Sequence, residues 1–564
     1  MDRSTDERLG RRKLLTRAGT VAVGGAVVGL TGRVAGAATG GGPGPAGGGG
    51  GPEATPFGPV SVRPGDSRYD SLLRGDNFRF VGRPEEIRVV GSTEQVVQAV
   101  ADAVRSGRRI AVRSGGHCFE NFTADPAVRL LVDLSPMDAV GFDPVMGAFA
   151  VQPGAALGHV YRTLFTGWGV TIPAGGCPEV GAGGHLVGGG YGPLSRRYGS
   201  VVDHLHAVEV VVVDRDGDVR TVVATRDPDD PNHDLWWAHT GGGGGNFGVI
   251  TRYWLRSPHA GATGSGALRH VDPAKLLPAA PRELLECLVV WAWDEKMNEQ
   301  AFTALLRNFG TWHEHNSAPG SPATGLYAVL LAGHRSSGTF QMVTQIDAGL
   351  PDADALLTGF VSAVTAGAGA TELVSLRRTM PWLHPTTWPG TGEAGNVFTR
   401  RYKDKAGYLR RRLTDTQLTS VYRHLTNSAG STDSGMLIVG YGGQVNTVPP
   451  HATAVAQRDS VMKAIYYTVW ADESDDAANL AWIRDFYRDV YRDTGGVPVP
   501  GEVSDGSYIN YPDVDLTDPA WNTSGTPWHT LYYKGNYPRL QRIKAHWDPR
   551  DVFRHALAIE PPPT

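Results

Sequence analysis

Cysteine is scarce in this sequence: its 564 residues include three, Cys118, Cys177 and Cys287. Three cysteines without a CxxC pair cannot build a disulfide framework and lack the spacing of a cysteine zinc site, so we expect no metal. Charge of one sign is not in excess either, because 53 basic residues face 57 acidic ones. That balance argues against a nucleic-acid-binding protein.

Three common catalytic signatures are also missing. The sequence contains no GxxxxGK(S/T), no GxSxG and no HExxH. These absences exclude the simplest interpretations as a P-loop nucleotide hydrolase, a serine hydrolase with a nucleophile elbow, or a zinc protease.

Glycine, by contrast, is abundant, with 74 residues, about twice its usual share of about 7%. Many of these glycines lie in three clusters, at 113–118, 173–192 and 241–248. Glycine lets backbone N–H groups approach a ligand closely, and successive N–H groups form a site for an anion such as a diphosphate. Together the clusters predict a large phosphate-bearing cofactor, although any one of them alone could be a surface loop.

The amino terminus has the features of an export signal. Arg11 and Arg12 precede a short apolar run, and Ala35-Gly36-Ala37 has the small residues of a cleavage site. We therefore expect a twin-arginine signal peptide over residues 1–37, a Gly/Pro-rich disordered linker over 38–64, and a secreted or extracytoplasmic protein. A short membrane anchor or a disordered tail is the alternative, but the apolar run is too short and too glycine-rich for a stable membrane span.

Hydrophobic periodicity predicts an α+β fold. A strand at 85–90, a helix that starts at the capping box Ser92–Gln95 and ends at Gly107, and a strand at 109–113 form a βαβ-like opening. A helix is expected at 156–165, and further strands at 129–133, 147–152, 208–213, 219–224 and 249–255. These elements make up a first domain over residues 80–258.

Two further regions follow the first domain. Over 259–500, expected strands (288–293, 326–331, 435–441, 464–470) alternate with expected helices (301–309, 475–493), which predicts a second domain of sheet and helices. Residues 501–560 form an aromatic carboxy-terminal segment that ends in a helix at 537–544.

Residues 243–248 match GxGxxG, the Rossmann fingerprint. The match precedes an expected strand instead of opening a helix, so the sequence does not support a Rossmann dinucleotide site there.

Two nucleophilic side chains lie inside glycine-rich turns. His117 follows Arg113-Ser-Gly-Gly, and Cys177 follows Pro173-Ala-Gly-Gly. An imidazole nitrogen and a thiolate can each form a covalent bond to an electrophilic cofactor. On the pattern alone, a core histidine and a buried free cysteine remain the simpler interpretation.

Several longer motifs bear on whether His117 and Cys177 bind a cofactor or are ordinary core residues. These motifs are Arg113-Ser-Gly-Gly-His117, Pro173-x-Gly-Gly-Cys177, Gly188-Gly-Gly-Tyr-Gly192, Lys403-Asp-Lys405, Tyr441-Gly-Gly443, Tyr508-Ile-Asn-Tyr-Pro-Asp513, Tyr533–Leu540 and Trp547–Arg554. With these, the sequence from about 80 to 560 resembles the berberine bridge enzyme-like flavoproteins of the vanillyl-alcohol oxidase/p-cresol methylhydroxylase (PCMH) superfamily. The resemblance implies a PCMH-type FAD-binding domain of two subdomains and a substrate domain with an antiparallel sheet covered by helices. It also implies that the segment 501–560 returns to the flavin.

The resemblance further implies FAD bound bicovalently, through its 8α-methyl group to His117 and through C6 to Cys177. The other cofactor-binding positions that it implies are Arg113, Ser114, Gly115, Gly116, Cys118, Val180, Gly183, Gly184, His185, Gly245, Asn246, Gly248, Asn510 and Tyr511.

Hydride transfer to flavin N5 requires a base that accepts the O–H proton of the substrate. The resemblance places Tyr508 in that role and Tyr191 at a similar active-site position, although Tyr508 could instead be a packing aromatic. Because a free tyrosine titrates near ~10, Tyr508 would need a cation or a hydrogen bond to act at neutral pH. Some relatives carry Glu, Gln or Lys on the strand that enters Tyr441-Gly-Gly, but here residues 435–440 have no ionisable side chain.

Val180 bears on the electron acceptor, because a small side chain at this position in relatives admits dioxygen to the flavin. We therefore expect an exported FAD-dependent oxidase that transfers hydride from an alcohol or sugar hemiacetal to bicovalent FAD and returns the electrons to O2, giving H2O2. The alternatives are a natural-product tailoring enzyme (oxidative ring closure or alcohol oxidation), a dehydrogenase with another acceptor, and a flavin-binding protein without catalysis.

The expected partners are O2 and a small-molecule substrate: a sugar, an oligosaccharide or a secondary-metabolite alcohol. Trp388 either stacks on that substrate or belongs to the core.

Overall fold

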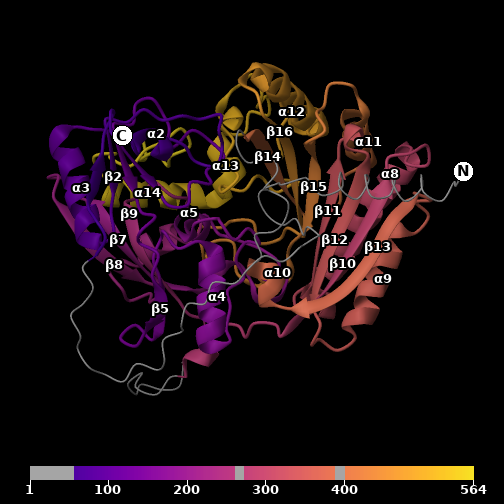
Figure 1. The fold of residues 1–564 in the computed structure, drawn as a ribbon, viewed down its shortest axis with the longest axis horizontal. Helices are drawn as coiled ribbons and strands as arrows, with labels where there is room; N and C mark the ends of the chain where they lie inside the picture. Colours follow the sequence, from indigo (N-terminus) through magenta and orange to yellow (C-terminus); the bar gives the residue numbers. More distant parts are fainter. Residues whose placement is uncertain (1–55, 259, 261–271, 388–399, 564) are drawn as a thin grey trace, which may run out of the picture.

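The computed structural model describes residues 56–258, 260, 272–387 and 400–563. The expected signal peptide, most of the expected linker and Trp388 lie outside the described residues. The described chain forms two lobes, with residues before about 258 in one and a large sheet with its covering helices in the other (Figure 1). None of the helices in these ranges combines the length and the hydrophobicity that a bilayer crossing requires.

The first lobe opens with a four-stranded sheet in the order β1-β2-β4-β3. Its strands are β1 (Val60–Val62), β2 (Glu86–Val89), β4 (Leu130–Asp133) and β3 (Ile110–Arg113), and the short helix α2 (Tyr69–Leu72) lies between β1 and β2. β2 and β3 both run parallel to β4, as the expected βαβ-like opening requires. Strand β1 lies inside the expected 38–64 linker, so that prediction is wrong at its last residues: ordered structure begins before residue 64.

Helix α3 (Thr93–Ser106) begins and ends where the sequence predicts. The Ser92 side chain accepts a hydrogen bond from the Gln95 backbone N–H, and Gly107 ends the helix with a left-handed φ of 65°. The Gln95 side chain accepts a hydrogen bond from the backbone N–H of Gly91, one residue before the expected partner Ser92.

A second sheet of the first lobe is five-stranded, in the order β5-β6-β9-β7-β8, and is antiparallel. Its strands are β5 (Val140–Asp143), β6 (Ala148–Val151), β9 (Val249–Leu255), β7 (Leu205–Val213) and β8 (Val219–Thr225), and the helices of this part are α4 (Leu157–Trp168), α5 (Ala182–Val187), α6 (Ser195–Tyr198) and α7 (His233–Ala238). The glycine cluster at 241–248 leads into strand β9 and not into a helix, which confirms that residues 243–248 are no Rossmann fingerprint.

The second lobe is built on a seven-stranded sheet in the order β13-β10-β12-β11-β15-β16-β14, antiparallel throughout. Its strands are β10 (Glu283–Ala292), β11 (Leu326–Gly333), β12 (Thr339–Asp347), β13 (Glu372–Pro381), β14 (Arg401–Leu409), β15 (Ser434–Gly440) and β16 (Met462–Trp470). Helices α8 (Glu299–Asn316), α9 (Ala353–Thr365), α11 (Asp415–Thr426) and α12 (Asp476–Val490) cover its outer face, and α10 (Leu383–Thr387) packs against α4 of the first lobe (Figure 1). This arrangement confirms the expected α+β class.

The carboxy-terminal segment returns to the first lobe, where helices α13 (Trp528–Tyr533) and α14 (Tyr537–Trp547) lie beside elements from the start of the chain (Figure 1). The fully buried Lys544 ammonium donates hydrogen bonds to the carbonyls of Asn246 and Phe553, at 2.9 and 2.5 Å. The Asn246 side chain in turn accepts from the backbone N–H of Ile559 at 2.8 Å. The end of the chain is therefore anchored on the third glycine cluster.

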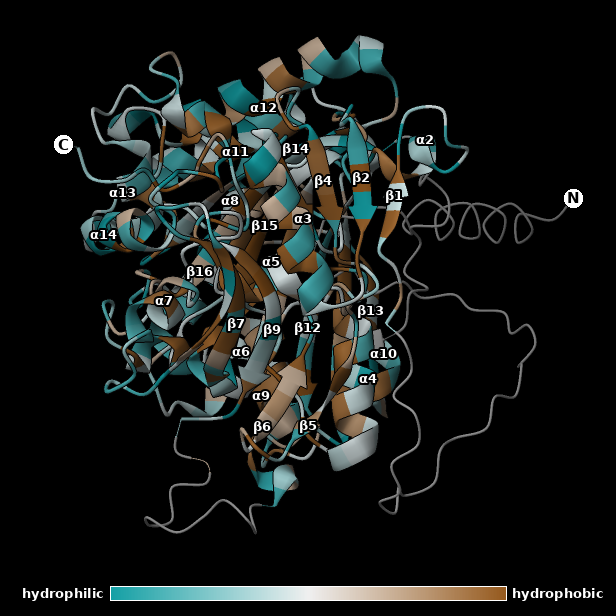
Figure 2. Ribbon diagram, turned by 90° about the vertical axis from the view of Figure 1, so that its left-hand side faces the viewer, coloured by the Kyte–Doolittle hydropathy of each residue, from teal (hydrophilic) through white to brown (hydrophobic). Residues whose placement is uncertain are grey.

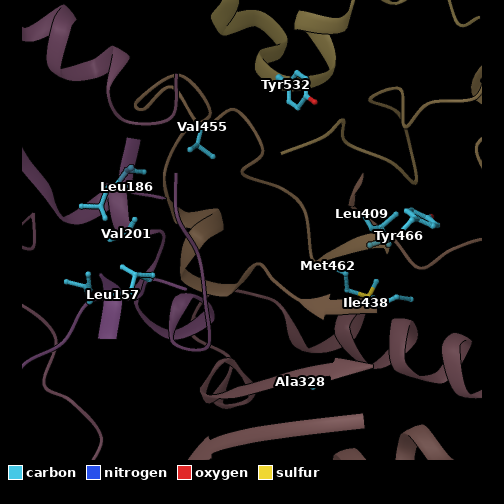
Figure 3. Close-up of a cluster of buried hydrophobic side chains, with 14 of the residues drawn as sticks. Leu157, Leu186, Val201, Ala328, Leu409, Ile438, Val455, Met462, Tyr466 and Tyr532 are labelled. Carbon is cyan, nitrogen blue, oxygen red and sulfur yellow. The ribbon is translucent and has the colours of Figure 1, made fainter. Parts of the chain in front are cut away.

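One hydrophobic core joins the lobes. The strands that form its centre are largely hydrophobic (Figure 2). Figure 3 shows members of the same buried cluster from both lobes: Leu157, Leu186 and Val201 from the first, and Ile438, Met462 and Tyr466 from the second. Burial of this cluster fixes the lobes against each other, and with them the groups that face the space between them.

Candidate active site

A single cavity collects the residues that the sequence singles out. Backbone and side chains from all three glycine clusters line it, together with the segment 508–512 and the tail 553–555. All the expected positions are among its lining residues: Arg113, Ser114, Gly115, Gly116, His117, Cys118, Cys177, Val180, Gly183, Gly184, His185, Tyr191, Gly245, Asn246, Gly248, Tyr508, Asn510 and Tyr511.

The two nucleophiles, His117 and Cys177, lie in separate loops of this cavity wall. His117 follows strand β3, and its Nδ1 lies 3.9 Å from Oδ2 of Asp76. Cys177 precedes helix α5, and its thiol donates to Oε2 of Glu179 at 3.4 Å. Both side chains are partly exposed and so can be reached by a ligand in the cavity.

The glycine loops of the wall suit a phosphate-bearing ligand. Gly243 and Gly245 adopt φ values of 84° and 75°, a left-handed conformation that side chains other than glycine rarely adopt. The Asn246 amide donates to the carbonyls of Gly242 and Gly243, each at 3.1 Å, and so fixes the loop. A cavity that combines such loops with two nucleophiles fits FAD, whose diphosphate needs backbone N–H groups.

Two expected cofactor residues, Arg113 and Asn246, use their side-chain hydrogen-bond donors within the protein. The Arg113 guanidinium binds Asp133 through Nε and Nη2, at 2.9 and 2.6 Å, and its Nη1 donates to the carbonyl of Leu72 at 2.6 Å. Like Asn246, Arg113 therefore supports the shape of a cavity loop.

Tyr508 and Tyr191 meet at the face of the second-lobe sheet that looks into the cavity. Their ring centroids are 5.5 Å apart at 75°. The Tyr191 hydroxyl is within hydrogen-bond distance of the Tyr511 hydroxyl at 3.1 Å. The Asn510 amide donates to the Tyr508 hydroxyl at 3.0 Å and to the backbone carbonyl of His185 at 2.9 Å. Asn510 therefore links the segment 508–511 to helix α5.

Sequence reasoning missed Lys463, the ionisable group of this tyrosine cluster. Its ammonium nitrogen lies 3.2 Å from the ring centroid of Tyr191 and 3.9 Å from that of Tyr508. It also lies 4.4 Å from the centroids of Tyr408 and Tyr441, and among the described residues it has no hydrogen-bond partner. Lys463 is on strand β16, where it pairs with Val439 of the neighbouring strand β15.

The strand that enters Tyr441-Gly-Gly indeed offers no ionisable group, but the next strand of the sheet does. The available signal was a single lysine in the apolar run Met462-Lys-Ala-Ile-Tyr-Tyr467.

Burial controls protonation in this cluster. It raises the pKa of Tyr508 well above its usual range, with Tyr511 acting in the same direction and the hydrogen bond from Asn510 opposing it. Burial also lowers the pKa of Lys463 well below its usual range. Burial, with the nearby Lys463, lowers the pKa of His185 to about 4, so this ring is neutral at pH 7, and its Nε2 accepts from the Gly175 N–H at 3.0 Å.

A buried ion-pair cluster holds the segment after Tyr508 against the loop after His117. The Lys403 ammonium contacts Glu120 and lies 2.8 Å from Oδ1 of Asp513. The Lys405 ammonium lies 2.7 Å from both Asp513 and Asp515. Removing one partner of a buried ion pair lowers the free energy of unfolding by about 3–5 kcal/mol. The cluster therefore holds the two segments firmly against each other.

Comparison with known proteins agrees with this geometry. Residues 84–222 match the FAD binding domain family, and residues 507–560 match the berberine and berberine-like family. Aclacinomycin-N/aclacinomycin-A oxidase of Streptomyces galilaeus is 54% identical over 89% of this chain and 90% of its own length. Hexose oxidase of Chondrus crispus is 31% identical over 88% of this chain and 93% of its own length.

Solved structures share the fold over most of this chain. The crystal structure of aclacinomycin oxidoreductase has a TM-score of 0.85 at 53% identity and covers 89% of this chain and 99% of its own. A glycopeptide hexose oxidase complexed with teicoplanin has a TM-score of 0.84 at 51% identity and covers 90% of this chain and 100% of its own. The chain therefore belongs to the berberine bridge enzyme-like family of FAD-linked oxidases.

Proposed function

We propose that this protein is an exported oxidase that takes hydride from a sugar or alcohol carbon of a bulky secondary metabolite. It holds FAD through His117 and Cys177 and passes the electrons to dioxygen. The observation that carries the proposal is the shared cavity, which both nucleophiles line together with Tyr508 and Tyr191, while Lys463 packs against the two tyrosine rings.

The proposed substrate class rests on which relatives have the higher sequence identity to this chain. The proteins named for aclacinomycins and for a glycopeptide hexose are 54% and 51% identical to this chain, whereas the one named for hexose alone is 31% identical. A large glycosylated or polycyclic substrate therefore suits this chain better than a free sugar. The twin-arginine signal supports export and rests on Arg11, Arg12 and the following residues.

When bound, FAD supplies the two-electron acceptor. The task of the protein is to take the hydroxyl proton of the substrate as hydride leaves the same carbon. The Tyr508 oxygen, which the Asn510 amide holds at 3.0 Å, accepts that proton. A charged Lys463 over the Tyr508 ring would stabilise a phenolate there, because a cation is attracted to the electron-rich face.

Reoxidation of the reduced flavin by dioxygen depends on the small size of the Val180 side chain. Val180 lines the cavity three residues after Cys177. Val180→Leu is expected to slow reoxidation of the reduced enzyme in air by at least about tenfold, because the added bulk blocks oxygen. Reduction of the flavin by substrate under anaerobic conditions should stay within about twofold of the wild-type rate. Stopped-flow absorbance of the two half-reactions checks this, and equal reoxidation rates in both proteins would remove Val180 from the account.

The proposed function is tested by peroxide release in air across a panel of an anthracycline, a glycopeptide and free hexoses. We expect the glycosylated metabolites to give the higher kcat/KM. Flavin that is bleached by these substrates without peroxide would indicate a dehydrogenase. Flavin that no member of the panel bleaches under anaerobic conditions would overturn the proposed substrate class.

A further inference from the structure

Each nucleophile of the cavity has a carboxylate beside it that the proposed oxidation does not use. We propose that Glu179 and Asp76 are the proton acceptors for covalent attachment of the flavin, Glu179 at Cys177 and Asp76 at His117. This inference rests on the bicovalent linkage proposed above.

Glu179 is placed to activate the sulfur. The Cys177 thiol donates to its Oε2 at 3.4 Å within one turn of the chain. A neighbouring carboxylate disfavours a resident thiolate because like charges repel. The sulfur therefore becomes nucleophilic as its proton passes to Glu179, as in general-base activation of a thiol. Glu179 is exposed, so the proton can leave to solvent.

Asp76 is fixed beside the imidazole by a close backbone contact. The Asp76 N–H donates to the carbonyl of Gly116 at 2.9 Å. A Cβ on Gly75 would lie 2.4 Å from that same carbonyl oxygen, so only glycine allows the two segments to approach this closely. The contact leaves Oδ2 of Asp76 3.9 Å from Nδ1 of His117. Arg400 Nη2 lies 4.0 Å from the same carboxylate oxygen and helps to position it.

The carboxylates meet a requirement of the bond-forming steps. When one ring nitrogen of His117 bonds to the 8α carbon, the imidazole ring becomes positively charged and loses the proton of its other nitrogen, which Asp76 accepts, while the 8α-methyl group loses its own proton to solvent. The sulfur of Cys177 that bonds to C6 loses its thiol proton to Glu179, and C6 loses its hydrogen as a proton.

Each new bond leaves two electrons on the isoalloxazine, and dioxygen takes these with two protons to give hydrogen peroxide. Attachment at both sites therefore removes four hydrogens from protein and FAD together and consumes two molecules of O2.

The experiment compares purified full-length Glu179→Gln, Asp76→Asn and wild-type proteins, with Asp138→Asn as a matched control. Asp138 is an exposed carboxylate of the same lobe that does not line the cavity. Peptide mapping by mass spectrometry gives the fraction of His117 and of Cys177 that carries flavin. Bound FAD after gel filtration and the thermal midpoint report on the fold.

Glu179→Gln is expected to keep the His117 bond and to reduce the Cys177-linked fraction at least about tenfold at equal times after FAD addition. Asp76→Asn should show the reverse, and Glu179→Asp should restore the sulfur bond. Both bonds at wild-type levels in Glu179→Gln and Asp76→Asn would overturn the inference. Wild-type protein with neither bond would instead overturn the proposed cofactor linkage, and the inference with it.

Discussion

Tyr508→Phe is expected to lower kcat for substrate oxidation by about 10²- to 10⁴-fold, the range that loss of a general base produces. The variant keeps the ring that packs against Tyr191 at 5.5 Å but removes the oxygen that Asn510 holds. The neighbouring hydroxyl of Tyr191 does not replace it, because that hydroxyl is engaged with the hydroxyl of Tyr511. The rate of flavin bleaching by substrate without oxygen measures the step directly.

A matched control for this variant is Tyr466→Phe. Tyr466 lies on the same strand β16 but on the face that packs against helix α12, where its hydroxyl donates to that of Tyr491 at 3.3 Å. Its loss should change the thermal midpoint more than the bleaching rate. A Tyr508→Phe enzyme that bleaches within about threefold of the wild-type rate would show that the proton goes elsewhere.

Lys463→Met is expected to lower the same bleaching rate about 10²-fold near pH 7. A buried ammonium without a hydrogen-bond partner is costly unless an anion lies beside it. The ionisations of Lys463 and Tyr508 are therefore coupled: Tyr508 loses its proton to form a phenolate most easily when Lys463 is protonated. The form with a Tyr508 phenolate and a protonated Lys463 can accept the substrate proton, whereas a neutral Tyr508 with a protonated Lys463 cannot.

The pH dependence follows from the direction of these shifts. Activity should rise with pH through the apparent pKa of the Lys463–Tyr508 pair. Burial lowers the pKa of Lys463, so this rising limb of the pH profile should lie below the usual lysine range near about 10.4. In Lys463→Met the base is Tyr508 alone, whose pKa burial raises, so the limb should move to higher pH. A profile of bleaching rate against pH for both proteins measures the displacement, and an unmoved limb would contradict the coupling.

A double-mutant cycle separates this role from simple packing. If Lys463 acts through Tyr508, Lys463→Met should cost little further activity in a Tyr508→Phe background. Independent, additive losses in the double variant would mean that Lys463 supports the reaction by another route.

Local sequence signals predicted helix α3 and most of the longer first-lobe strands, because these elements carry their own start and stop residues, but the sequence analysis did not predict β1, β5 or helices α5, α6 and α7. Helix α3 has its cap at Ser92 and its end at Gly107, and the hairpin of β7 and β8 turns on Asp214 and Gly217. Strand β14 was missed because Arg401–Lys405 is highly charged, a composition typical of exposed chain. Its lysines are buried only because Glu120, Asp513 and Asp515 arrive from distant parts of the sequence.

The same distinction holds for the site. The glycine motifs led to the cavity lining from 113 to 118 and from 175 to 192, since close backbone approach leaves a mark in the sequence. Lys463 is marked locally only as a lone lysine in an apolar run, and Asp76 only by the glycine that precedes it. Lys463 is placed by the pairing of β15 with β16, and Asp76 by the contact of Gly75 with Gly116. Their roles depend on tertiary neighbours that no local pattern contains.

The central claim, a flavin bonded to both His117 and Cys177, is tested most directly by intact mass of the acid-denatured enzyme. The account predicts a yellow precipitate and a mass equal to the polypeptide plus one FAD less four hydrogens. His117→Ala and Cys177→Ala should each keep one covalent bond to the flavin, and their masses should equal the variant polypeptide plus one FAD less two hydrogens. A colourless precipitate with the mass of the polypeptide alone would contradict it.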